Sequence, residues 1–194
     1  CTSGQMTDAQ LSNYVKAKTL YLQGDFDAVL KTLKVSDYSV SNGNQALLLV
    51  AKSYFMRYQP DKAEPILLRL TKHYPRYTEA QLWLIRSYLA QNKLDQAEKE
   101  LALAMRFNGE DPRLMQLMAS LHGAKKEYQK AFEYYARASD FADEIGKSEI
   151  ELAQLYYRFG QKEKALYHVQ RAKTLISSDN VLSRALDDLE KKIK

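Results

Sequence analysis

Three histidines and one cysteine are the side chains of this sequence best suited to bind a metal or to act as a nucleophile. The histidines are His73, His122 and His168, and none has a second metal ligand one helical turn further on. Cys1 lacks the oriented base that a nucleophilic thiol needs. The 7 glycines are scattered, so they form no phosphate-binding loop. These patterns predict no enzymatic activity, no metal site and no cofactor.

The composition is typical of a globular chain with a mild positive charge. Hydrophobic residues make up 45% and charged residues 27% of the sequence, and the net charge is +5 from 29 basic and 24 acidic residues. No run approaches the roughly 18 apolar residues of a membrane span. There is no basic run or recognisable nucleic-acid-binding module. The excess charge fits either a solvated lysine-rich surface or a preference for acidic partners.

Small residues recur at a spacing of 34 residues and indicate which elements position the other side chains. One column consists of Val29, Ala63, Ala97, Ala131 and Ala165. A second column consists of Leu20, Tyr54, Tyr88, His122 and Tyr156. Two further columns are Ala17, Ala51, Ile85, Ala119 and Ala153, and Ser36, Leu70, Ala104, Ala138 and Ala172. Columns that keep one period without insertion predict a helical solenoid.

This pattern resembles the tetratricopeptide repeat, a helix–turn–helix unit of about 34 residues. The resemblance implies an all-α solenoid with a C-terminal capping helix over 180–192. The repeat units are expected at 10–43, 44–77, 78–111, 112–145 and 146–179. Each pair of helices carries an apolar stripe that only a neighbouring pair can cover, so a single superhelical domain is predicted from 7 to 194.

Local signals predict where several helices begin. Thr7–Gln10, Thr78–Gln81 and Ser148–Glu151 have the spacing of capping boxes. Asp111 is followed by Pro112, which predicts an N-cap and a proline at the first helical position. The polar stretch 37–44 contains Asn-Gly turn chemistry and is predicted to be the longest irregular connection.

The resemblance also implies which residues line a concave groove, because four positions of the first helix of each unit serve this purpose in the family. In the first three units the groove residues are Tyr14, Lys18, Tyr21, Leu48, Lys52, Phe55, Leu82, Arg86 and Leu89. We interpret Lys18, Lys52 and Arg86 as a ladder for carboxylates, with the aromatic residues as apolar anchors. The alternative is a solvated row with stems over apolar neighbours, paired in part with Glu79. The family's carboxylate clamp needs Asn partners at places where this sequence has Lys and Arg, so that activity is not expected.

A sequence that begins at Cys resembles a processed bacterial lipoprotein, whose first residue is a diacylated cysteine. This resemblance implies lipidation of Cys1, a tether over 1–6 and anchoring at the periplasmic face of the outer membrane, since Thr2 is not Asp. There is no other cysteine, which excludes a disulfide framework. Alternatively, Cys1 is accidental and the numbering starts at an arbitrary position.

Together these patterns predict a non-enzymatic, membrane-anchored scaffold that binds an envelope protein through its groove. A pilotin-like role in secretion or pilus assembly is the leading specific hypothesis, by resemblance. The alternatives are a ligand-binding partner of a periplasmic transporter, which needs an enclosed cavity, and a cytosolic peptide adaptor. Neither a small-molecule substrate nor a nucleic-acid partner is expected.

Overall fold

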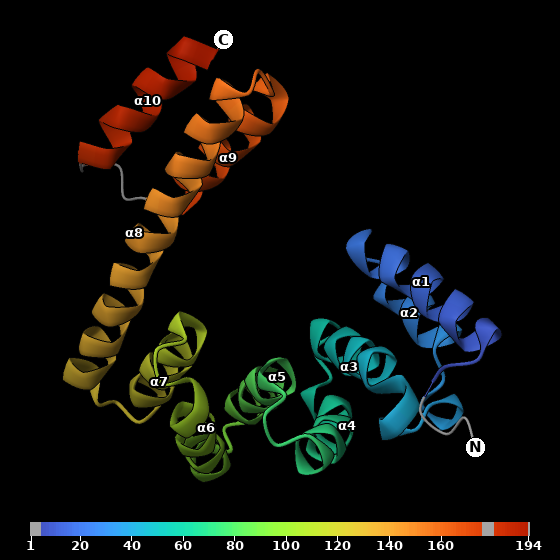
Figure 1. Cartoon of the computed structure of the whole chain (residues 1–194). Coiled ribbons are helices and arrows are strands. Elements are labelled where there is room, and N and C mark those ends of the chain that lie inside the picture. Colours follow the sequence, from blue (N-terminus) through green and yellow to red (C-terminus); the bar gives the residue numbers. More distant parts are fainter. Residues whose placement is uncertain (1–4, 176–180, 194) are drawn as a thin grey trace. The chain divides into compact units, whose positions relative to one another are not determined.

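The computed structural model describes residues 5–175 and 181–193, and helices make up most of them (Figure 1). The first helices are α1 (Asp8–Leu22), α2 (Phe26–Thr32), the short 3₁₀ helix Val35–Asp37, α3 (Val40–Met56), α4 (Pro60–His73) and α5 (Thr78–Ala90). They are followed by α6 (Leu94–Asn108), α7 (Pro112–Ala124), α8 (Tyr128–Arg158), α9 (Lys162–Leu175) and α10 (Val181–Ile193). Within the described ranges, no helix is both long and apolar enough to cross a bilayer.

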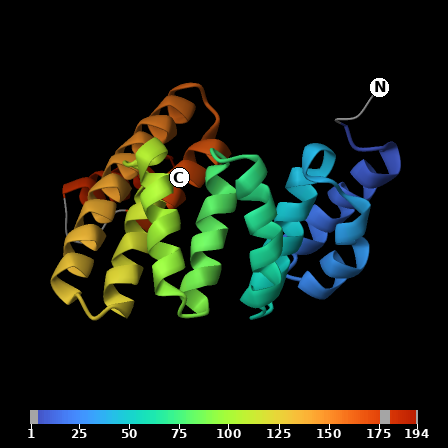
Figure 2. The same cartoon turned by 90° about the horizontal axis from the view of Figure 1, so that it is seen from below.

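The contacts divide the chain into two compact units, Cys1–Ala131 and Phe132–Lys194, and each is described by itself. In the first unit, α1 packs on α2, α3 on α4 and α5 on α6. The first helices of successive pairs also contact one another, α1 with α3, α3 with α5 and α5 with α7. Figure 2 shows the helices of this unit side by side in chain order. The order of stacking is therefore the one that the repeat predicts.

The small residues of the repeat columns lie where the helices cross. Val29, Ala63 and Ala97 have no exposed area, and Tyr88 is also buried. A small side chain at a crossing lets two helix backbones approach closely, and larger neighbours then fill the core between pairs. The buried residues of the first unit form one continuous cluster from Ala17 to Leu121. The periodicity in the sequence therefore located the core correctly.

The stretch 37–44 is predicted to be an irregular loop, and this prediction is wrong from Val40 onward, where α3 begins. The backbone N–H of Asn42 donates to Ser39 Oγ at 3.3 Å, and the Ser39 N–H donates to Asn42 Oδ1 at 2.9 Å. This reciprocal cap starts α3 at Val40. Gly43 then kinks the helix with φ −137° and ψ 27°, under the buried ring of Tyr38. Asn42 therefore helps to cap the helix and Gly43 bends it, whereas the sequence pattern predicted that this pair forms a turn.

Gly43→Ala is expected to lower the free energy of unfolding by about 1–3 kcal/mol, because the core has no room for a methyl group there. A Cβ at this position would lie 2.6 Å from Tyr38 Cδ1 and 2.7 Å from Tyr38 Cβ. Gly123→Ala in α7 is the matched control, since a Cβ there meets nothing within 4 Å. Urea unfolding of both variants measures the difference. Equal stabilities would show that the Tyr38 contact does not restrict Gly43.

Of the four predicted helix starts, those at Thr7 and Asp111 are confirmed and the one at Ser148 is wrong, while α5 begins at Thr78 as expected but without the predicted cap. Thr7 forms its capping box with Gln10, and Asp111 caps α7 through the Arg113 N–H. Thr78 is not a cap, because Tyr77 precedes the helix and the Thr78 hydroxyl instead accepts from Asn108 Nδ2 at 2.8 Å. Ser148 lies inside α8, so it cannot begin a helix.

The second unit contains most of α8 together with α9 and α10. α8 runs unbroken from Tyr128 to Arg158, across the predicted boundary between units at 145/146. This stretch has no proline, and the single Gly146 costs a helix only about 1 kcal/mol, which neighbouring helix formers offset. Ile150, Val169 and Leu186 belong to a core shared by the three helices. α10 takes the place of the predicted capping helix 180–192, and residue 180 lies outside the described residues.

Candidate functional site

The first helices of the first unit form a surface with a cavity of about 430 Å³ between α1 and α3. The cavity is lined by Tyr14, Lys18, Tyr21, Leu22, Gln45, Leu48, Leu49, Lys52 and Tyr77. Several predicted groove residues therefore do lie together. Burial raises the pKa values of the Tyr14 and Tyr21 hydroxyls, so both remain neutral and can donate hydrogen bonds.

Trp83 on α5 is the centre of the neighbouring part of this surface. Its ring makes an edge contact with Phe55 at 5.3 Å between centroids. Lys52 Nζ lies 5.1 Å and the Arg86 guanidinium 4.8 Å from the Trp83 ring centroid, which are cation–π distances. The indole N–H donates to Glu79 Oε1 at 3.1 Å. We call the surface formed by Tyr14, Lys18, Tyr21, Lys52, Phe55, Trp83 and Arg86 the α1–α3–α5 face.

Glu79 is a carboxylate shared by two cations at this face. Lys52 Nζ lies 3.4 Å from Glu79 Oε1, and Arg113 Nη1 lies 3.0 Å from Glu79 Oε2. Arg113 also pairs with Asp111 at 2.8 Å. Burial raises the pKa of Glu79, but the hydrogen bond from Trp83 and the two cations outweigh burial and lower it overall. The Lys52–Glu79 pair that the alternative interpretation includes is therefore present, and the ladder for carboxylates stays a prediction.

Arg86 differs from Lys52 because no carboxylate neutralises it at contact distance. Its guanidinium is half-buried against Trp83, and among the described residues no carboxylate lies within the 4.0 Å of an ion pair. Burial lowers the pKa of Arg86 and outweighs the attraction of the more distant Glu79 and Asp111 carboxylates, which reflects the cost of removing this cation from water. Lys18 is exposed and is likewise without an ion pair in the part of the chain that the structure describes. The face therefore retains positive charge after its internal pairs are formed.

Comparison with known proteins agrees with the geometry of the helix pairs. Residues 54–121 match a family model described as tetratricopeptide repeat. The chain has the tetratricopeptide repeat fold. No match is found among the curated proteins.

Two solved structures superpose on most of the chain. The protein TTC0263 of Thermus thermophilus is 21% identical, with a TM-score of 0.60 over 93% of this chain and 98% of its own. The MamA protein of Desulfovibrio magneticus is 17% identical, with a TM-score of 0.62 over 90% of this chain and 99% of the chain in that structure. At these identities the likeness shows the fold alone.

Not all of the predicted groove residues lie at the surface of the stacked helix pairs. Leu82 has no exposed area and belongs to the core, so its assignment to the groove is corrected: a ligand cannot reach it. Leu48 is 7% exposed and borders the cavity, and Leu89 is half-buried against the core. Within the described residues, no group of three or more His, Cys, Asp and Glu side chains is placed to hold a metal ion.

Trp83 is the functional candidate that the sequence analysis missed. It does not fall on a groove position of the repeat, although it is the only tryptophan of the chain. Glu79 lies four residues before it and Arg86 three residues after it, which places all three on one side of a helix. The spacing of these charged residues around the tryptophan is the feature of the sequence that could have identified Trp83 as a site residue.

Acidification is expected to release the Glu79 pairs and change the fluorescence of Trp83. Because folding lowers the pKa of Glu79, its stabilising contribution is fully present above the ordinary value of 4.5 and is lost as the pH falls through the lowered pKa. The change in Trp83 emission should therefore occur below pH 4.5. Glu79→Gln should remove it. An identical acid transition in that variant would show that other groups cause the change.

Proposed function

We propose that the chain is a non-enzymatic scaffold whose α1–α3–α5 face binds an acidic segment of another protein. The observation that carries this proposal is Arg86, a half-buried cation stacked on Trp83 that has no carboxylate within ion-pair distance among the described residues. A desolvated guanidinium gains most from a carboxylate that docks on it, because charge-assisted hydrogen bonds are about twice as strong as neutral ones. Lys18 on α1 offers a second cation that has no ion pair within 5–175 and 181–193.

The cavity beside these cations supplies the apolar part of the proposed site. Tyr14 and Tyr21 border it from α1, and Leu48 borders it from α3. Aromatic residues in such cavities commonly carry much of the binding energy of a protein interface. The expected ligand therefore combines carboxylates with an apolar or aromatic side chain that enters the cavity.

Fluorescence of Trp83 provides the experiment, because the only tryptophan of the chain lies at the proposed site. A short Glu-rich peptide with one leucine should change the emission in a saturable manner, whereas its Gln counterpart should not. Arg86→Gln should weaken binding about tenfold. Lys99→Gln, which removes a cation from the exposed side of α6, should leave it unchanged. Equal binding of both peptides would contradict the proposal.

Glu79→Gln is expected to change the affinity for the Glu-rich peptide in the opposite direction from Arg86→Gln. Glu79 occupies Lys52 and Arg113, so it competes with any carboxylate that approaches them. Its replacement by Gln should strengthen binding of the Glu-rich peptide several-fold, in keeping with the value of charge-assisted bonds. A weaker complex would show that Glu79 orders the site for its ligand and does not compete with it.

The membrane anchor and the biological system are finer parts of the hypothesis. Cys1 and the predicted tether lie largely outside the described residues, so lipidation, outer-membrane localisation and a pilotin-like role in an envelope assembly remain predictions. Mass spectrometry of the N-terminus of the protein from its native source tests the anchor. A diacylated Cys1 is expected, and an unmodified one would remove this part of the hypothesis but not the acidic-segment proposal.

A further inference from the structure

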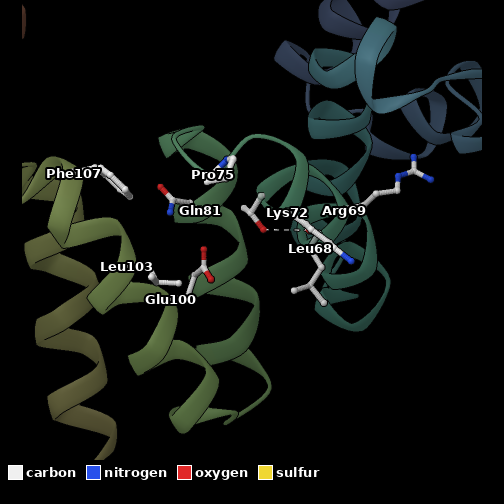
Figure 3. Close-up of a pocket in the computed structure, with 9 residues that line it drawn as sticks. Leu68, Arg69, Lys72, Pro75, Gln81, Glu100, Leu103 and Phe107 are labelled. Atoms are coloured by element: carbon white, nitrogen blue, oxygen red, sulfur yellow. Dashed lines mark hydrogen bonds between the residues drawn. The ribbon is translucent and has the colours of Figure 1, made fainter.

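A second cavity, of about 620 Å³, lies between α4, the start of α5, and α6 (Figure 3). It shares no lining residue with the α1–α3–α5 face. Its apolar wall includes Leu68, Leu103 and Phe107, which are 42%, 46% and 49% exposed. Its volume falls within the range of cavities that bind small organic groups.

Gln81 gives this cavity a polar floor. The residue is 2% exposed, and its Oε1 has no hydrogen-bond partner among the residues that the structure describes. Leaving a buried acceptor unpaired costs about 1–3 kcal/mol. Figure 3 shows the Gln81 oxygen directed toward Phe107, whose exposed ring borders the cavity. Because the oxygen is itself buried, a ligand reaches it only when that ring moves aside.

A second acceptor lies next to Gln81. The Glu100 carboxyl lines the same cavity, and burial raises its pKa. Arg69 and Lys72 lie at the opposite side of the cavity (Figure 3). These two cations disfavour a positively charged ligand, and the Glu100 carboxyl beside Gln81 disfavours a carboxylate. The group that fits is therefore neutral, apolar and able to donate a hydrogen bond.

We propose that this cavity binds the indole ring of a tryptophan on a partner polypeptide, with the indole N–H donating to Gln81 Oε1. An indole nitrogen is a donor only, so it leaves no lone pair facing Gln81 and Glu100, whereas a phenol oxygen would. A phenylalanine fills the apolar space but leaves the Gln81 oxygen unpaired. The chain's own Trp83 does not supply the ring, because it is packed on the α1–α3–α5 face.

NMR titration of the full chain with N-acetyl-tryptophanamide tests this proposal. Signals of Leu68, Leu103 and the Gln81 side-chain amide should shift together and saturate. The analogue with a methylated indole nitrogen should bind about tenfold more weakly, because it cannot donate to the Gln81 oxygen. Equal binding of the two compounds would overturn the proposal, and so would the absence of shifts at these residues. Binding of free indole without binding of N-acetyl-tryptophanamide would also overturn it, because the site would then exclude a polypeptide residue.

Gln81→Met isolates the role of the acceptor, because methionine has a similar length and no acceptor amide. This variant should bind both tryptophan compounds with similar affinity. Gln96→Met, the same change on the exposed surface of α6, should keep the tenfold preference. The comparison of the two compounds on the unmodified protein stands even if the Gln81 variant does not fold. A preference that persists in folded Gln81→Met would assign the hydrogen bond to another group and refute the proposal.

Discussion

Replacement of Lys18, Lys52 and Arg86 together by glutamate is expected to lower the affinity for the Glu-rich peptide by about 100-fold or more. Each substitution removes an attraction and adds a repulsion, and juxtaposed like charges cost several kcal/mol at an interface. The effect should be largest at Arg86, where the stack on Trp83 keeps the guanidinium half-buried. Fluorescence of Trp83 or calorimetry measures the change in affinity.

The matched control for this experiment reverses two lysines and one arginine elsewhere. Lys31 on α2 and Lys99 and Arg106 on α6 are exposed and lie on second helices of their pairs. Their replacement by glutamate changes the net charge equally and should weaken binding only modestly, through long-range attraction that salt screens over roughly 10 Å. If both triple variants bind equally, the cations of the α1–α3–α5 face are a solvated row and the ladder hypothesis is wrong.

Leu101→Ala is expected to lower the free energy of unfolding of the first unit by about 2–5 kcal/mol. Leu101 on α6 has no exposed area and belongs to the continuous core of that unit. Its truncation removes apolar contacts and leaves a cavity that packed helices cannot close. Trp83 fluorescence during urea unfolding reports on this unit specifically, which matters because two compact units need not unfold together.

Leu103→Ala is the control for the core substitution. Leu103 lies two residues further along the same helix and is 46% exposed, so the identical chemical change should cost well under half as much. If the two variants lose equal stability, α6 does not pack with Leu101 inward, and the stacking order of the helix pairs is contradicted.

The sequence predicted the core of the first unit well because alanine columns impose a distance constraint. A residue such as Ala63 or Ala97 is required wherever two helices cross closely, so its spacing repeats with the fold. Cap residues carry less information. Thr78 has the spacing of a capping box, yet its hydroxyl accepts from Asn108, thirty residues away in the chain. Such long-range competition for a hydroxyl is not visible in a local pattern.

The predicted break between the fourth and fifth repeat units is absent for a related reason. The repeat period continues through 145/146, and Ala138 and Ala153 are buried in column positions. The period says nothing about whether a turn separates them, and without a proline the helix continues through the whole of α8. The small residues of the repeat columns are therefore buried as predicted, but no turn interrupts the helix at the predicted unit boundary.

The sequence predicted which cations lie at the candidate site, but it predicted only some of the contacts that these cations make. Lys52 and Arg86 follow from the groove positions of the repeat, but both stack on Trp83, which the repeat does not place in the groove. Leu82 occupies a groove position but is buried. Whether a residue at a helix edge faces solvent depends on the tilt of the next helix pair, and packing across pairs fixes that tilt.

The most direct test of the proposed function is amide NMR mapping of the unmodified chain with the Glu-rich peptide. We predict saturable shifts concentrated on α1, α3 and α5, centred on Lys18, Lys52, Trp83 and Arg86, together with the arginine side-chain signal of Arg86. Shifts confined to α4 and α6, or no shifts at peptide concentrations that saturate the fluorescence change, would contradict the claim that this face binds acidic polypeptide.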